Sequence, residues 1–135
     1  MKIVVDTYAW IEIFIGSPKG DRARKILAET REVYTPDVVL AEVARKYFRE
    51  RIEQEVIFER LNKISEASSV VPIDPEVAVE AARCYEELSE KARKGGVRAP
   101  SLFDAIVLGV ARVLKAKVVT GDEHLKGLPQ TFWLD

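Results

Sequence analysis

Asp104 is the only charged residue in SLFDAIVLGVA, the apolar stretch from residue 101 to 111. A helix that is apolar nearly all round is usually buried, and a buried carboxylate needs a hydrogen-bond partner or a cation. Ser101 and Asp104 also match the S-x-x-D capping signal, directly after Pro100. The sequence therefore leaves two explanations for this acid, a helix cap and a place in a functional site.

Two more carboxylates, Asp6 and Asp122, come directly after predicted strands, in IVVD and KVVTGD. In open parallel sheets, ligand sites form beyond the carboxyl ends of the strands, so both acids are expected at the same edge. The first turn of the Asp104 helix is expected at this edge as well. Each of the two strand-end acids is also a candidate N-cap for the element that follows it.

A cluster of acids at one edge would raise the pKa of its members unless a cation neutralised them. Oxygen ligands without several Cys or His residues favour Mg²⁺ or Mn²⁺. Glu42, in TPDVVLAEVARKY, lies about two turns into a predicted helix and off its apolar stripe. From spacing alone, we expect Glu42 to be a solvated glutamate.

Strands separated by helices position these residues. The Val-rich strands do not alternate with polar residues, which indicates a single α/β domain with a central parallel sheet and helices on both faces. We predict strands at 2–5, 117–121 and 131–134, a short strand or extended turn at 33–36, and a strand and turn over 70–75. Helices are predicted at 7–15, 18–28, 53–65, from Pro75, and 101–114. A further helix is expected to begin at Pro36 with Thr35 as its cap, and its predicted stripe is Leu40, Val43, Ala44, Tyr47 and Phe48. The stripe predicted for the helix from Pro75 is Ala78, Ala81, Ala82, Tyr85 and Leu88.

Composition sets the broad class. The chain has 135 residues, of which 47% are hydrophobic and 32% charged, so we expect one globular domain over residues 1–135. The net charge of −1 argues against a broad nucleic-acid-coating surface. The single cysteine, Cys84, is expected to be a packed residue. We expect a cytoplasmic protein with no membrane partner, because no signal peptide and no membrane-length apolar run is visible.

Four ordered motifs resemble those of the PIN-domain ribonucleases, specifically the short toxins of VapBC toxin–antitoxin pairs. They are VVDTYAWIE, TPDVVLAEVARKY, APSLFDAIVLGVAR and VVTGDEHLKGL. The resemblance implies that Asp6, Glu42, Asp104 and Asp122 are catalytic and metal-binding, with Thr120 as the supporting hydroxyl. It also implies a Mg²⁺- or Mn²⁺-dependent endoribonuclease that forms a homodimer and pairs with a VapB-type antitoxin.

Two other functions remain open on the sequence. The chain is alternatively an RNA-processing PIN-like nuclease outside a toxin pair, or an inactive PIN-like module that binds RNA or protein. Metal-dependent cleavage of RNA separates the inactive module from both nucleases.

Basic residues near the acidic motifs are candidates for RNA contact, chiefly Arg45, Lys94 and Arg98. An ordinary solvated charge run is the alternative explanation for them. His124 and Leu125 stand where the family often has an aromatic residue, which is a departure from its pattern. We expect His124, the only histidine, to be a surface or capping residue.

Overall fold

The computed structural model describes all 135 residues and contains one five-stranded sheet in the order β3-β2-β1-β4-β5. Every pair of neighbouring strands is parallel, which confirms the predicted α/β class. The strands are Lys2–Val5 (β1), Glu32–Pro36 (β2), Ser69–Val71 (β3), Lys117–Thr120 (β4) and Thr131–Trp133 (β5). The helices are Thr7–Ile15 (α1), Pro18–Glu29 (α2), Asp37–Arg49 (α3), Gln54–Ala67 (α4), Pro75–Lys94 (α5) and Leu102–Leu114 (α6), with a short 3₁₀ turn, η1, at Glu123–Leu125.

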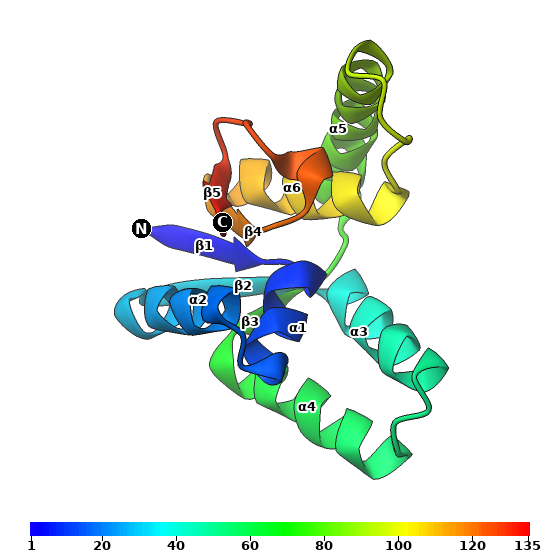
Figure 1. Cartoon of the computed structure of the whole chain (residues 1–135). Coiled ribbons are helices and arrows are strands. Elements are labelled where there is room, and N and C mark those ends of the chain that lie inside the picture. The colour runs from blue at the N-terminus through cyan, green and yellow to red at the C-terminus, as the bar shows by residue number, and fades with distance from the viewer.

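The helices form a layer on each face of the sheet. Figure 1 shows α1, α2, α3 and α4 in the lower half of the view, beside β2 and β3, and α5 and α6 in the upper half, beside β4 and β5. The central strands are consequently buried on both sides, and Ile3, Val4 and Val5 of β1 are fully inaccessible to solvent. Burial on both faces explains why the strands are continuous apolar runs rather than alternating patterns.

The order in which strands are added to the sheet reverses at β1. The chain runs outward from β1 through β2 to β3, and then returns to the opposite side of β1 to form β4 and β5. In parallel sheets, such a reversal leaves a crevice at the carboxyl ends of the two strands that flank it. α1 and α3 start at this edge because they follow β1 and β2, and α6 starts there because it runs back toward the beginning of β4 (Figure 1).

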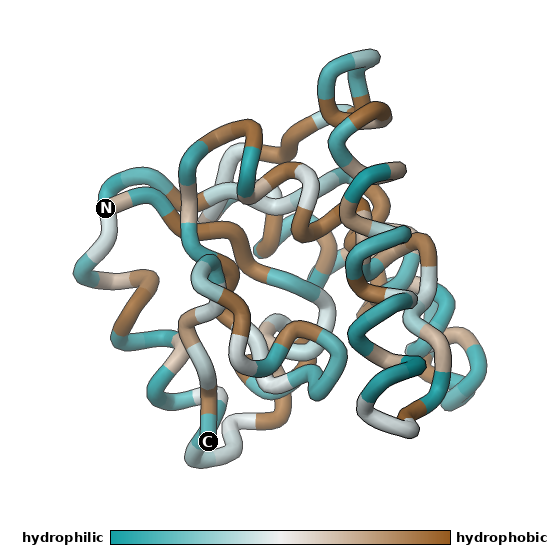
Figure 2. The backbone as a smooth tube through the Cα atoms, turned by 90° about the horizontal axis from the view of Figure 1, so that it is seen from above, coloured by the Kyte–Doolittle hydropathy of each residue, from teal (hydrophilic) through white to brown (hydrophobic).

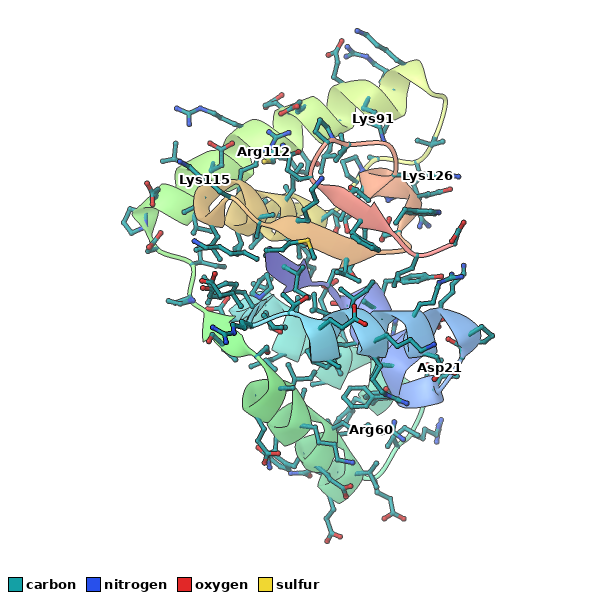
Figure 3. The ribbon with its side chains drawn as sticks, turned by 90° about the vertical axis from the view of Figure 1, so that its left-hand side faces the viewer. Asp21, Arg60, Lys91, Arg112, Lys115 and Lys126 are labelled. Atoms are coloured by element: carbon teal, nitrogen blue, oxygen red, sulfur yellow. The ribbon has the colours of Figure 1, made fainter.

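The two helices of the upper layer pack closely because small residues meet at their contact. A Cβ atom added at Gly109 of α6 would lie 2.9 Å from the backbone nitrogen of Ala81 in α5. At the rim of the same contact, Arg112 of α6 donates hydrogen bonds of 2.6 and 3.0 Å to the carboxylate of Glu87 in α5 (Figure 3). This helix pair positions the start of α6.

The predicted cap of the third helix is wrong. Pro36 occupies the N-cap position of α3 without a side-chain capping bond. Thr35 is instead a buried residue of β2, where its hydroxyl accepts a 3.1 Å hydrogen bond from the indole N–H of Trp10 and shares a 2.7 Å bond with Ser68. Pairing with the neighbouring strands therefore outweighs the local capping signal.

Two predicted apolar stripes are only partly correct: Val43 and Tyr47 of α3, and Ala81 and Leu88 of α5, are buried as predicted, but other members are half-buried or exposed. In α3 the buried residues are Val39, Val43 and Tyr47, whereas Phe48 is 70% exposed. In α5 the buried residues are Val77, Ala81, Cys84, Leu88 and Ala92, so the prediction was wrong for Ala78, Ala82 and Tyr85. In both helices apolar residues flank the buried stripe, and contact with the neighbouring helix decides which side is covered. Cys84 is fully buried, as predicted.

Hydrophilic and hydrophobic residues alternate along the helical parts of the backbone (Figure 2), as expected for helices with one face on the core. None of the helices combines the length and the apolar character needed to cross a bilayer.

Candidate active site

Asp6 lies at the carboxyl end of β1 and is only 5% exposed. One carboxylate oxygen caps α1 by accepting a 2.9 Å hydrogen bond from the backbone N–H of Ala9, and the other accepts one from the hydroxyl of Thr120. Burial raises the pKa of the Asp6 carboxyl to about 7, against the opposing effect of these two hydrogen bonds. The charges of Asp122 and Asp104 raise it further. The capping role and a place in the cluster are therefore compatible.

Thr120 links the ends of the two central strands. Its hydroxyl donates to Asp6 and accepts a 2.9 Å hydrogen bond from the backbone N–H of Asp122. Asp122 in turn caps η1, because its carboxylate accepts a 2.9 Å hydrogen bond from the backbone N–H of His124. The loop after β4 is thus held in register with the end of β1, which fixes where Asp6 and Asp122 stand relative to each other.

Asp104 forms a capping box with Ser101 at the start of α6. The Ser101 hydroxyl accepts a 3.1 Å hydrogen bond from the backbone N–H of Asp104, and the Asp104 carboxylate accepts a 3.0 Å bond from that of Ser101. Burial raises the pKa of the Asp104 carboxyl above its ordinary value despite these bonds, and the Asp122 charge raises it further. The structure therefore confirms the helix cap and also brings the Asp104 carboxyl close to that of Asp122.

Glu42 is half-buried rather than fully solvated, contrary to the expectation from helical spacing. Its carboxylate accepts a 2.7 Å hydrogen bond from the hydroxyl of Thr7 in α1. Burial raises the pKa of the Glu42 carboxyl, and the nearby charges of Asp104 and Asp122 add to this increase. Glu42 therefore belongs to the same acidic cluster as the other three carboxylates.

The four acids line one cleft of about 390 Å³ at the carboxyl edge of the sheet. Its other walls come mostly from α1, and the ring of Tyr8 packs so tightly on Gly121 that a Cβ added at this glycine would lie 2.3 Å from it. The remaining lining residues are Thr7, Tyr8, Ile11, Glu12, Ile15, Lys46, Val107 and Leu125. The cleft combines an acidic floor with largely apolar walls.

His124 is not the surface residue that the sequence suggested, since its side chain is only 9% exposed. One ring nitrogen, Nε2, lies 2.8 Å from the carbonyl oxygen of Arg98, and the other, Nδ1, lies 3.2 Å from the carboxylate of Asp122. Burial lowers the pKa of the ring, but the Arg98 carbonyl and the carboxylates of Asp122 and Asp104 outweigh it and raise the pKa above its ordinary value. The ring's contact with Arg98, 26 residues away in sequence, is what sequence reasoning missed.

Basic residues surround the acidic cluster on two sides. Arg45 lines a cleft beside Glu42 together with Lys46 and Arg49. Arg98 lines a second cleft with Asp104, Asp122 and His124 among others. Lys94 lines neither of these two clefts. It lies in the last turn of α5, where its ammonium is 3.6 Å from the carboxylate of Glu90.

The donor set of the cluster suits a hard divalent cation. It offers carboxylate oxygens with raised pKa values, and a cation would relieve the mutual repulsion that contributes to those values. A subset of three residues, Asp104, Asp122 and His124, presents one ligand atom each within 4.8 Å of one another. The structure therefore contains an acidic group with the geometry of a possible metal site.

Comparisons with known proteins agree on the fold. The model of the PIN domain family matches residues 3–130. A toxin–antitoxin complex from Klebsiella pneumoniae contains a chain with a TM-score of 0.73 and 17% identity, and the alignment covers 99% of this chain and 98% of that one. DNA-bound VapBC from Salmonella typhimurium gives a TM-score of 0.72 at 22% identity, with coverage of 100% and 99%.

A third similar structure is VapC20 of Mycobacterium tuberculosis, described as a sarcin–ricin loop cleaving toxin. Its TM-score is 0.66 at 20% identity, over 90% of this chain and 91% of that one. No curated protein sequence matches the chain significantly. At these identities, the structural neighbours show a shared fold over essentially the whole chain.

Proposed function

The chain belongs to the PIN domain family, and on this premise we propose that it is a divalent-metal-dependent endoribonuclease, the VapC-type toxin of a VapBC pair. The observation that carries the proposal is that four carboxylates from four separate segments line one cleft. This cleft lies at the carboxyl ends of β1 and β4, where the strand order reverses. Hydrolysis of a phosphodiester requires charge stabilisation and an activated water, which a carboxylate-held cation provides.

Asp6, Glu42, Asp104 and Asp122 are the residues that we propose hold Mg²⁺ or Mn²⁺. When bound, the ion would supply positive charge for the phosphate oxygens and lower the pKa of a nearby water. Three of the four carboxyls have raised pKa values in the metal-free protein, so ionising them together is unfavourable without a counter-charge.

The chain's own residues keep these acids in place. Thr120 positions Asp6 through its hydroxyl, and Thr7 positions Glu42 in the same way. The capping box fixes the Asp104 carboxylate on the first turn of α6. Because each acid is held by at least one hydrogen bond from the protein, the cluster is ordered before any ligand binds, which favours catalysis by pre-organised electrostatics.

We propose that RNA approaches over the basic clefts on either side of the cluster. Arg45 and Arg98 line clefts that Glu42 also lines, so phosphates bound to either arginine would lie beside the acids. Lys94, paired with Glu90, would contact only a more distant part of the RNA. A net charge of −1 fits this local arrangement, since the positive charge needed is confined to the cleft borders.

We propose a homodimer and a VapB-type antitoxin as the protein partners. Several of the similar structures are toxin–antitoxin complexes, which motivates the antitoxin. Large apolar side chains are exposed on α1, α3 and α4, namely Ile15 at 66%, Phe48 at 70% and Phe58 at 57%. Exposed apolar residues of this size are common at sites of protein association.

The decisive experiment is cleavage of a structured RNA by the purified protein, free of antitoxin. Cleavage is expected with Mg²⁺ or Mn²⁺, to be absent with EDTA, and to be lost in Asp104→Asn while the far-UV circular dichroism stays unchanged. Asp21→Asn is the matched control, because Asp21 is also in the first turn of a helix but is exposed and on α2 (Figure 3).

No cleavage by the folded parent protein with either ion would contradict the nuclease proposal and favour the inactive binding module. Cleavage without any antitoxin gene beside that of this chain would instead favour the RNA-processing role. Normal cleavage by Asp104→Asn would leave Asp104 as a helix cap alone.

A further inference from the structure

His124 lies between the 95–100 loop and two carboxylates of the acidic cluster. Its Nε2 is 2.8 Å from the carbonyl oxygen of Arg98, and its Nδ1 is 3.2 Å from Asp122 Oδ1 and 3.8 Å from Asp104 Oδ2. The ring is largely enclosed, with 9% of the side chain exposed. It is therefore held in one orientation, with Nδ1 facing the two acids.

The chemistry of these contacts determines what each ring nitrogen presents. A carbonyl oxygen only accepts hydrogen bonds, so Nε2 carries the hydrogen and donates it to Arg98. In the neutral ring, Nδ1 then points a lone pair at two carboxylate oxygens, and this repulsion is removed either by a proton on Nδ1, which Asp122 accepts, or by a metal ion that binds Nδ1 and the carboxylates together. Histidine ligands of metal ions show the same arrangement, with the second N–H fixed by a carbonyl or carboxylate.

We propose that Nδ1 of His124 joins the carboxylates of Asp104 and Asp122 in binding a divalent ion, and that this nitrogen makes the site prefer Mn²⁺ and other first-row transition ions to Mg²⁺. An imidazole nitrogen suits transition ions, whereas Mg²⁺ prefers oxygen ligands throughout. The inference rests on the proposed metal-dependent nuclease and specifies which ion that enzyme uses.

The distances are compatible with coordination. Ligands about 2.1 Å from one octahedral ion lie about 3.0 Å apart when adjacent and about 4.2 Å apart when opposite. The separations of 3.2 and 3.8 Å between Nδ1 and the two oxygens fall within this interval. Each of these oxygens accepts a backbone hydrogen bond, from His124 at 2.9 Å and from Ser101 at 3.0 Å, and keeps a further lone pair for an ion.

The three ligand residues line the cleft that Arg98, Ala99, Pro100 and Ser101 border, so an ion has a route from solvent. Asp104 and Asp122 also line the larger cleft that contains Asp6. Asp104 and Asp122 therefore lie between His124 on one side and Asp6 on the other.

The test is pulsed electron paramagnetic resonance of Mn²⁺ bound to the tag-free protein. Because the chain has one histidine, any ¹⁴N modulation of the imidazole type is assigned to His124. We expect this modulation in the parent protein, and we expect it to change to the ¹⁵N pattern when the protein is made with ¹⁵N-labelled histidine.

A variant measures the contribution of the nitrogen to ion selectivity. The amide nitrogen of Gln occupies nearly the place of Nε2, so His124→Gln keeps the donor to Arg98 but removes Nδ1. By calorimetry we expect it to weaken Mn²⁺ binding about 10- to 100-fold, as is typical when a metal site loses a supporting contact, and to leave Mg²⁺ binding nearly unchanged. Glu123→Gln, an exposed neighbour in the same turn, is the matched control.

The outcomes separate this inference from the function on which it rests. Mn²⁺ binding and RNA cleavage without nitrogen modulation would overturn the inference and leave the nuclease intact, with His124 only positioning the loop. Equal losses of Mn²⁺ and Mg²⁺ affinity in His124→Gln would overturn the claimed selectivity. A folded protein that binds neither ion and cleaves no RNA would overturn both proposals.

Discussion

Asp6→Asn is expected to stabilise the metal-free protein at neutral and alkaline pH while abolishing cleavage. The Asp6 carboxyl is 5% exposed, and burial raises its pKa from 3.8 to about 7. Between these two pH values the unfolded chain loses the proton that the folded protein keeps. The stability of the parent therefore falls as pH rises through this interval and levels off above about pH 7.

The size of the effect follows from the shift. Each pH unit between the two pKa values costs about 1.4 kcal/mol, so ionised Asp6 destabilises the metal-free fold by about 4 kcal/mol at pH 8. The neutral amide removes this cost and its oxygen still caps α1 at Ala9. The hydroxyl of Thr120 loses its acceptor, which costs about 1 kcal/mol. The expected net gain is about 3 kcal/mol at pH 8, and the expected net change at pH 4 is a small loss.

Urea unfolding in EDTA across this pH range measures the difference. Asp74→Asn is the matched control, because Asp74 caps α5 with the same 2.9 Å bond to a backbone N–H but is exposed. A difference between Asp6→Asn and the parent that stays constant from pH 4 to pH 8 would refute the reasoning. Added Mg²⁺ or Mn²⁺ should stabilise the parent most at pH 8 and have little effect on the variant.

Three further predictions concern the scaffold, the RNA and the assembly. Gly109→Ala is expected to lower the free energy of unfolding by about 1–3 kcal/mol, because its Cβ would lie 2.9 Å from the backbone of Ala81; an unchanged urea midpoint would argue against this close contact. Arg98→Ala is expected to weaken RNA binding and to reduce the slope of log affinity against log salt by about 0.7, as measured by fluorescence anisotropy; an unaltered slope would remove Arg98 from the interface. Light scattering at micromolar concentration is expected to report a homodimer whose cleavage of RNA the cognate antitoxin suppresses; a strict monomer that the antitoxin does not inhibit would contradict both parts.

The sheet and two of the acids follow from local patterns in the sequence. Asp6 and Asp122 are each adjacent to a Val-rich strand, and the carboxyl ends of parallel strands share one edge, so their common location requires no knowledge of the helices. The same logic fails for Glu42, whose environment depends on Thr7 of another helix. Helical spacing gives only the direction of a side chain from its own axis, and that direction does not reveal what lies opposite.

The wrong predictions also arise from contacts between distant segments. Thr35 precedes a helix and resembles its cap, but its backbone pairs with β3 and its hydroxyl bonds the indole of Trp10 and the hydroxyl of Ser68. The orientation of the His124 ring depends on the carbonyl of Arg98, a backbone atom that carries no signal in the sequence. The location of residues at strand ends is therefore predictable from sequence, whereas a contact between two loops is not.

The hydrogen bond between Thr120 and Asp6 joins residues 114 positions apart, and it has a consequence during synthesis on the ribosome. A nascent chain that has reached residue 115 already contains Asp6, Glu42 and Asp104, but it does not yet contain β4, the strand that pairs with β1. Until β4 emerges and pairs with β1, the hydroxyl that orients Asp6 is missing, and one side of the central strand remains unpaired. We therefore expect the nascent chain to gain the hydrogen bond that orients Asp6 only after β4 has been synthesised and has paired with β1.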